Sequence, residues 1–285
     1  MHIEDAWLWH RRWSALATRR LRTLIWFGRA NVSLLVLGAL LGATAAEVNR
    51  NGVNNIVLGA VGAAALAAAA FVQGRWLTSE RVQERVAARS ASESIKSAVI
   101  QRQVGVGNFA GSQGDALLGE VMRDVEARTA ALIAAATVLE PDALSLPKIH
   151  NIADYVDERA RDQENWHIRA ARKRMRIEAR WRGAEVLATL TAALISAIGI
   201  ETKVQDLAIW VGVATTIATA LTAYRAREQH ARIAAGYART ANNLGRLLSQ
   251  FDVNTADDAE SATFVNDIES VLSQEDTNWS TQTTT

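Results

Sequence analysis

The chain alternates between long apolar runs and long polar runs, and four of the apolar runs contain no charged residue. A helix needs about 20 apolar residues to cross about 30 Å of hydrocarbon, so these runs predict membrane spans. The first run is short unless Arg29 reaches toward the interface, and the third must bury Glu185 or cross a thinned bilayer. The charge-free runs lie at 30–46, 51–74, 186–200 and 207–224, and the predicted spans at about 27–46, 52–73, 183–200 and 207–224.

Short connectors pair these spans. The segments EVNRNG and IETKVQD join the first span to the second and the third to the fourth, as helical hairpins require. Few alternating β-branched runs occur, and the only two prolines, Pro141 and Pro147, leave long helices uninterrupted elsewhere. The pattern predicts an all-α membrane protein: two transmembrane helical hairpins, four spans in all, extended by cytoplasmic helices that form a bundle.

The main alternative is a soluble bundle of alanine-rich core helices. The short connectors favour lipid, and so do tryptophans at the segment ends, where amphipathic rings settle at headgroup depth. Small residues also fill the segments, and Gly59, Ala63 and Ala67 form a small-xxx-small stripe. An alanine-rich soluble helix would show that stripe too. The expected membrane-interface anchors are Trp26, Trp76, Trp181 and Trp210.

The arginines predict the orientation of the hairpins. They precede the first and third spans and follow the second and fourth, whereas the two connectors carry almost no net charge. By the positive-inside rule, both termini and the central region are cytoplasmic. The basic stretch 169–182 is therefore expected to meet anionic lipid headgroups rather than nucleic acid. A cleaved secretory signal ending at Ala45 is a weaker alternative, because the long region before it contains acidic residues.

The two halves of the chain resemble each other. Trp26 aligns with Trp181, and the pair Trp9-His10 corresponds to Trp166-His167 with a two-residue slip. Shared low complexity would also produce such similarity. We predict an N-terminal two-span unit at 1–115, a cytoplasmic connecting helix and linker at 116–149, a C-terminal two-span unit with a closing cytoplasmic helix at 150–279, and a mobile tail at 280–285.

No catalytic chemistry is indicated. The net charge of +1 shows no overall bias toward nucleic acid, and cysteine is absent. The five histidines are dispersed without metal-binding spacing. The glycine-rich run 104–114 has no predicted strand before it, so we interpret it as a flexible linker rather than a phosphate cradle. We expect no enzyme activity, no catalytic residue, no metal and no cofactor.

Motifs in the second half resemble a known superfamily. A polar stripe precedes a basic helix and a two-span hairpin, and a tyrosine motif and an acidic closing run follow. This order resembles the SLATT superfamily, the two-transmembrane effector domains associated with nucleotide-synthesising and nucleotide-sensing modules in bacteria. The first half looks like a second, divergent member. One departure is His167, where a tyrosine is more usual. The motif residues are Tyr155, Arg159, Gln163, Trp166, Tyr237, Glu269, Glu275 and Trp279.

The motif stripe is expected to pack against other cytoplasmic helices or to meet a partner. Tyr155, Arg159, Gln163 and Trp166 follow one another at intervals of four, four and three residues, which places them along one side of a helix. Packing against the apolar closing helix around 264–272 is favoured over a ligand site.

The resemblance implies a role in bacterial conflict systems, including antiphage defence, with membrane permeabilisation as the outcome. It implies the bacterial inner (cytoplasmic) membrane as the location. A signalling nucleotide or a sensor protein is the implied trigger. The other expected partners are the lipid bilayer and further copies of the chain, which would form a homo-oligomer.

Two functions fit the spans. In the first, the chain oligomerises and polar span residues line a pore or ion channel, although each hydroxyl could instead bond its own backbone. In the second, the hairpins anchor a non-conducting scaffold or sensor whose cytoplasmic helices recruit partner proteins. The candidate pore-lining residues are Asn31, Ser33, Thr44, Asn54, Asn55, Thr189, Thr191, Ser196, Thr215, Thr216, Thr219 and Thr222.

Two opposite charges are expected at similar depth at the span entrances. The repeat alignment places Arg29 next to the position of Glu185. An ionisable group inside the interface is usually paired or functional. We therefore predict that Arg29 and Glu185 pair, between hairpins or between subunits.

Overall fold

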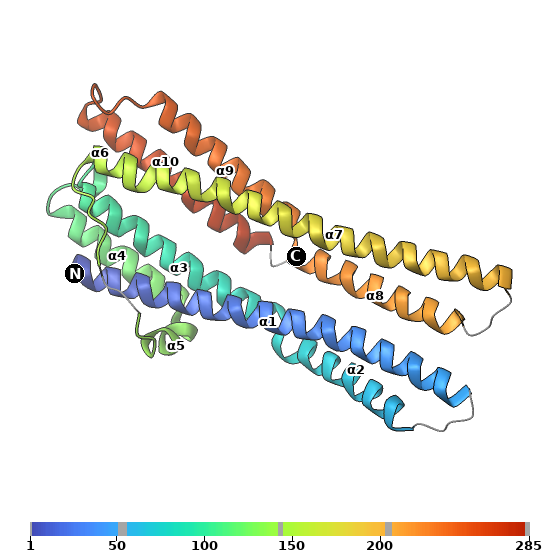
Figure 1. Ribbon diagram of the computed structural model, residues 1–285. Helices are drawn as coiled ribbons and strands as arrows, with labels where there is room; N and C mark the ends of the chain where they lie inside the picture. The colour runs from blue at the N-terminus through green and yellow to red at the C-terminus, as the bar shows by residue number, and fades with distance from the viewer. Residues whose placement is uncertain (1, 51–55, 142–144, 203–206, 283–285) are drawn as a thin grey trace. The chain divides into compact units, whose positions relative to one another are not determined.

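The computed structural model is built from helices, which confirms the predicted all-α class (Figure 1). Helices take up 89% of the chain, and the described residues contain no strand. The structure describes residues 2–50, 56–141, 145–202 and 207–282, and within these it leaves the side chains at 50, 199–202, 207–208 and 275–282 undescribed.

Two helical hairpins carry the apolar runs. α1 (Ile3–Arg50) continues without a break from the polar N-terminal stretch through the first expected span, and α2 (Ile56–Trp76) follows it. α7 (Asp162–Thr202) likewise joins the basic stretch to the third expected span, and α8 (Leu207–Glu228) follows. Neither long helix contains a proline, so nothing in the sequence interrupts its hydrogen-bond ladder.

Three helices of the described part are long and apolar enough to cross a membrane: Ile3–Asn49, Ile56–Trp76 and Ile152–Ile198. In their most apolar windows only 11%, 17% and 0% of the residues are buried within the chain. The core helices of a soluble bundle would be covered instead, so the chain is a membrane protein. α8 is not among the three, and a count of four spans stays a prediction.

The remaining helices are shorter and more polar. They are α3 (Ser79–Val104), α4 (Gln113–Arg128), α5 (Ile133–Thr137), α6 (Ile152–Tyr155), α9 (His230–Gln250) and α10 (Asp258–Gln282). Three short helical turns connect them: η1 (Gly107–Phe109), η2 (Ala130–Leu132) and the π-helical turn η3 (Val156–Arg161).

The chain folds into two compact units that do not follow the sequence halves. The bundle unit contains Met1–Arg22, Ser79–Arg172 and Ala234–Thr285. The membrane unit contains Thr23–Thr78 and Lys173–Ile233, and so holds both hairpins. Each half of the sequence therefore contributes to both units.

The bundle unit has two apolar cores, and α3 contributes to both. The first core packs Trp13 of α1 against Ile95 of α3 and Leu118 of α4. The second packs Tyr155 and Ile268 with Ile100, which also lies on α3. A helix from the first half of the chain is thus part of the core of the second half.

Two connecting segments differ from expectation. The connecting helix predicted within 116–149 is divided at Thr129, the C-cap of α4, whose hydroxyl donates to the carbonyl of Val125 at 2.6 Å. The glycine-rich run holds the turn η1, and Phe109 within it is buried in the first core. The interpretation of this run as a free linker is therefore wrong.

The first hairpin closes through glycines. A Cβ atom on Gly38 of α1 would lie 2.7 Å from the Leu66 side chain of α2, and one on Gly62 would lie 3.1 Å from the backbone nitrogen of Gly42. The helices therefore approach closely at a Gly-xxx-Gly pair, as small-residue seams in membranes do. The expected stripe is not this seam, because Ala63 and Ala67 are exposed.

Candidate functional site

A buried ion pair links the two motif regions of the second half. Arg159, in the π-helical turn η3, donates from Nε to Oε1 of Glu269 at 3.0 Å and from Nη2 to Oε2 at 2.9 Å. The Tyr155 hydroxyl donates to the same Oε1 at 3.0 Å. The Arg159 and Glu269 side chains are only 4% and 5% exposed. π-helical turns often mark functional positions in helices, and this one holds the arginine of the pair.

The network keeps its charges at neutral pH. Burial alone would raise the pKa of Glu269, but the charge of Arg159 and hydrogen bonds from Arg159, Ser97 and Tyr155 outweigh it and lower that pKa. Burial would lower the pKa of Arg159, yet the carboxylate of Glu269 raises it. Burial and the same carboxylate raise the pKa of Tyr155, which stays a hydrogen-bond donor. Because Ser97 lies on α3, the network also includes the first half of the chain.

The other motif residues have different neighbours. The ring of Trp166 packs edge-to-face on Tyr237, with centroids 5.3 Å apart, and also contacts the ring of His167. Gln163 and Trp166 do not take part in the Arg159–Glu269 network; they line a cavity instead. The side chains of Glu275 and Trp279 lie outside the described residues. The motif stripe therefore divides between a packing role, at Tyr155 and Arg159, and a cavity wall.

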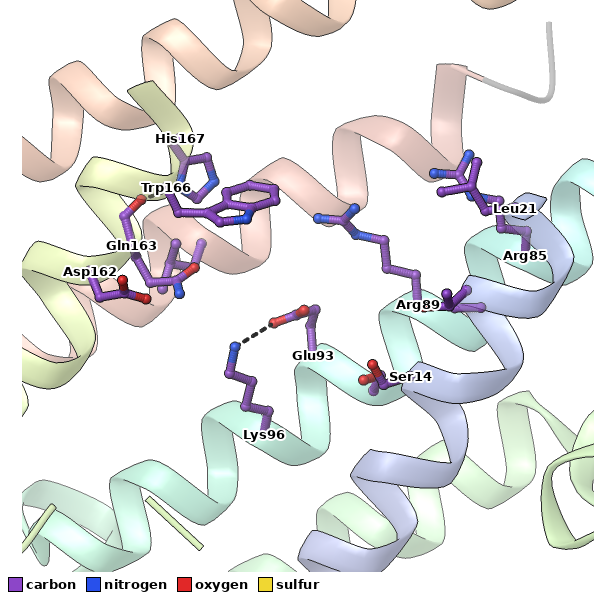
Figure 2. Close-up of a pocket in the computed structure, with 14 residues that line it drawn as sticks. Ser14, Leu21, Arg85, Arg89, Glu93, Lys96, Asp162, Gln163, Trp166 and His167 are labelled. Atoms are coloured by element: carbon purple, nitrogen blue, oxygen red, sulfur yellow. Dashed lines mark hydrogen bonds and ion pairs between the residues drawn. The ribbon is translucent and has the colours of Figure 1, made fainter. Parts of the chain in front are cut away.

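The cavity has a volume of about 400 Å³ and lies within the bundle unit. Figure 2 shows Trp166 and Gln163 of α7 on one side and Arg89, Glu93 and Lys96 of α3 on another. Helix α1 supplies a further wall. The lining residues are Ser14, Ala17, Thr18, Leu21, Arg85, Arg89, Ser92, Glu93, Lys96, Asp162, Gln163, Trp166, His167 and Leu272.

Charge dominates the α3 wall of the cavity. Lys96 Nζ lies 3.9 Å from Glu93 Oε2. Burial and the nearby charge of Arg159 lower the pKa of Lys96. Burial would raise the pKa of Glu93, but the positive charges of Lys96, Arg89 and Arg159 lower it. The carboxylate is therefore charged at neutral pH.

A buried histidine lies beside this wall. His10 is 6% exposed, and its Nδ1 lies 2.9 Å from the carbonyl oxygen and 3.0 Å from the hydroxyl of Ser92. Burial lowers the pKa of His10 from 6.5 to about 4, although the bond to the Ser92 carbonyl opposes the shift. His167, its counterpart in the repeat, is buried as well and contacts the carbonyl of Gln163 at 2.6 Å.

The thermal unfolding midpoint of the detergent-solubilised protein is expected to decrease as the pH is lowered from 7 to 5. Unfolded His10 takes up a proton below pH 6.5, whereas folded His10, with a pKa of about 4, resists protonation. The contribution of neutral, buried His10 to the free energy of unfolding is fully present above pH 6.5. It is lost progressively as the pH falls toward 4, by roughly 3 kcal/mol in total. His10→Asn, which does not titrate, should show a flatter midpoint against pH. Equal slopes for the two proteins would contradict this assignment.

In the membrane unit, Glu185 pairs within its own hairpin. Arg225 of α8 forms ion pairs with both Glu178 and Glu185 of α7, and the Thr222 hydroxyl donates to Glu185 Oε1 at 2.6 Å. Arg29 interacts with Tyr224 by charge and a side-chain hydrogen bond. The predicted pairing of Arg29 with Glu185 between hairpins is not found in the single chain, because Arg225 of the same hairpin is the ion-pair partner of Glu185. A pairing between subunits stays a prediction.

Most candidate pore-lining hydroxyls bond their own helix. The hydroxyls of Thr44, Thr189, Thr191, Thr215 and Thr216 donate to the carbonyl four residues earlier, at 2.8–2.9 Å, and the Thr222 hydroxyl, which donates to Glu185, lies 3.0 Å from the corresponding carbonyl. Asn31 Oδ1 is buried without a hydrogen-bond partner among the described residues. Asn54 and Asn55 lie outside the described residues. The exposed candidates are Ser33, Thr189, Thr191, Ser196, Thr215, Thr216, Thr219 and Thr222.

The four expected interface tryptophans have two kinds of surroundings. Trp26 is 64% exposed and Trp210 is 36% exposed. Trp76 stacks on Phe27 with ring centroids 4.5 Å apart, and Trp181 packs on Tyr224 at 4.6 Å. Trp76 and Trp181 therefore each join the two helices of a hairpin at its polar end. A contact of these rings with lipid headgroups stays a prediction.

Sequence reasoning missed the charged wall of the cavity. Arg85, Arg89, Glu93 and Lys96 follow one another on α3 at intervals of four, four and three residues, the same spacing as the motif stripe. That spacing places them along one side of a helix. The signal was available, but without a partner helix it could not be distinguished from an ordinary solvated face.

These features define an all-α membrane protein in which apolar hairpins continue from a helical bundle. Comparison with protein families agrees with a membrane protein built from helical hairpins. Residues 155–279 match the family described as SMODS and SLOG-associating 2TM effector domain 1 (SLATT), and residues 5–116 match Protein of unknown function (DUF4231). Residues 155–279 therefore belong to the SLATT family, and the two matches together support SLATT-like units in tandem. No curated protein and no solved structure matches the chain.

Proposed function

We propose that the protein is an oligomeric membrane effector that permeabilises the bacterial inner membrane as a pore or channel, in a conflict or antiphage response. The main support is the apolar surface of α1, α2 and α7, which the chain itself leaves uncovered. The family description adds an effector role for the C-terminal domain. In this proposal both termini and the bundle unit are cytoplasmic, and the chain is not an enzyme.

A face of α8 supplies the polar surface that a pore needs. Thr215, Thr219 and Thr222 follow at intervals of four and three residues, and Thr216 lies beside them. All four are exposed in the single chain. A hydroxyl that donates to its own backbone still presents its oxygen as an acceptor, so this face can contact water or a cation when several copies assemble.

Removal of the hydroxyls is expected to change ion flux while leaving the fold unchanged. We expect purified protein in liposomes to release an entrapped ion, and Thr215→Val with Thr216→Val and Thr219→Val to change its rate or ion preference several-fold. Valine keeps the shape of threonine but lacks the oxygen. Thr263→Val is the matched control, because Thr263 of α10 makes the same bond to the carbonyl four residues earlier, at 2.8 Å, outside the spans.

The alternative, a non-conducting scaffold or sensor, gives the opposite result. A scaffold leaves liposomes ion-tight under every trigger tested and tolerates the three valines without change. Overexpression separates the two in cells, because a pore is toxic and the valine variant should alter that toxicity. Ion-tight liposomes together with harmless overexpression would reject the pore.

A further inference from the structure

We infer that the cavity of the bundle unit binds a small aromatic anion, a planar ring that carries a compact phosphate or carboxylate group. Arg85, Arg89 and Lys96 bring three positive charges to its lining, against two negative charges from Glu93 and Asp162. The lining therefore has a positive excess, and Lys96 carries its charge in a site where burial disfavours it. An incoming anion would relieve that cost.

The α7 wall provides the surface for the ring. Trp166 is 37% exposed although it is held by edge-to-face contacts with Tyr237 and His167. Those contacts fix the indole, so little rotamer entropy is lost when a planar ligand packs on it. Stacking on an aromatic side chain is favourable for any planar ring of base size, because every such ring has a π-face. Gln163 beside it offers both a hydrogen-bond donor and an acceptor.

The size and chemistry of the cavity fit such a ligand. A volume of about 400 Å³ lies in the range of small-molecule sites. Arginine binds phosphate and carboxylate oxygens in a bidentate manner, and lysine acts as a point charge. A membrane headgroup would not need the tryptophan, and an uncharged ring would not need the arginines. The combination favours a soluble molecule that has both features.

The binding site also joins the two halves of the chain. Its α3 wall belongs to the segment matched at 5–116 and its α7 wall to the segment matched at 155–279. Two of its helices, α1 and α7, continue as single helices into the apolar segments. Binding itself does not depend on the proposed function; only a regulatory consequence for permeation rests on it.

Calorimetric titration of the detergent-solubilised protein tests the site. The probes are adenosine 5′-monophosphate and indole-3-acetate as aromatic anions, inorganic phosphate as an anion without a ring, and adenosine as a ring without the anion. We expect at least one aromatic anion to bind at least ten-fold more tightly than phosphate or adenosine. The preferred anion distinguishes a phosphate from a carboxylate ligand.

Variants assign the binding to the cavity. Trp166→Leu and Lys96→Gln should each weaken binding about ten-fold, whereas Trp166→Phe retains a ring and should retain most of it. Arg161→Gln is the matched charge control, because Arg161 is exposed and does not line the cavity. If Lys96→Gln lowers the thermal midpoint, weaker binding in that variant could come from unfolding. The comparison of Trp166→Leu with Trp166→Phe then decides whether the cavity is the binding site. Absence of binding by both aromatic anions, equal binding of all four probes, or unchanged binding in Trp166→Leu would overturn the proposal.

Discussion

Glu269→Gln is expected to destabilise the bundle unit by roughly 3–5 kcal/mol, because removal of one partner leaves the other charge buried and unpaired. Arg159 would lose its carboxylate in a site where its side chain is 4% exposed. Tyr155 would lose an ionised acceptor. The measurement is the thermal midpoint of the detergent-solubilised protein, together with the rate at which a protease cleaves the bundle.

A neighbouring pair provides the control. Arg161 and Asp157 form an ion pair in the same π-helical turn, but their side chains are 61% and 64% exposed. Exposed pairs contribute about 0–1 kcal/mol, so Asp157→Asn should hardly change the midpoint. Similar losses in Glu269→Gln and Asp157→Asn would show that burial of the first pair has no energetic consequence.

An all-apolar replacement tests the reason for the loss. Arg159→Met, Glu269→Met and Tyr155→Phe together remove both buried charges and the tyrosine hydroxyl, so of the network only the Ser97 hydroxyl loses its partner. Such replacements are often neutral or stabilising when the volumes are similar. We expect the triple variant to be more stable than Glu269→Gln alone. If it is also inactive in permeabilisation, the network contributes to function rather than to stability.

The sequence was sufficient to predict the hairpins and the packing of Tyr155 on the closing helix, and insufficient to predict most other contacts. Charge-free runs and short connectors correctly predicted hairpins, because lipid requires long apolar helices whatever their neighbours are. The seam of the first hairpin was not predicted: Gly38 and Gly42 of α1 have the Gly-xxx-Gly spacing and approach Gly62 of α2, and a contact of the stripe Gly59, Ala63 and Ala67 with another helix stays a prediction. Small residues occur on every side of α2, so composition alone could not select one face.

For the site residues too, the sequence identified individual residues but not how they come together. Tyr155, Arg159 and Glu269 were predicted from a motif, but the distance of 110 residues between Arg159 and Glu269 gave no sign that they form one ion pair. The cavity was not foreseen at all, because its walls come from α1, α3 and α7. The two stripes of equal spacing became informative only when the fold placed the α3 stripe and the last two residues of the motif stripe, Gln163 and Trp166, on one cavity.

Arg225→Gln is expected to lower the amount of folded protein in the membrane several-fold. Arg225 is the shared partner of Glu178 and Glu185, whose side chains are only 18% and 20% exposed. Without it, the two carboxylates, near the entrance of a predicted span, have no ion-pair partner among the described residues, and unpaired charge in a membrane is costly. The measurement is the quantity of protein in the membrane fraction. Arg227→Gln is the control, because Arg227 forms its ion pair with the adjacent Glu228 and is 37% exposed, so its loss removes a cation and its contact with the Tyr224 ring but strands no carboxylate of α7.

Two charge swaps then decide which arginine Glu185 needs. The structure predicts that Glu185→Arg and Arg225→Glu are each damaging and that their combination partly restores the membrane fraction, since attraction across the hairpin is re-formed with reversed sign. Combining Glu185→Arg with Arg29→Glu should not restore it. The reverse pattern would mean that Glu185 pairs with Arg29, and since the two do not meet within the single chain, that pair would have to form between subunits. The same experiment therefore separates a hairpin that is complete in one chain from one whose interfacial charges are satisfied only in the oligomer.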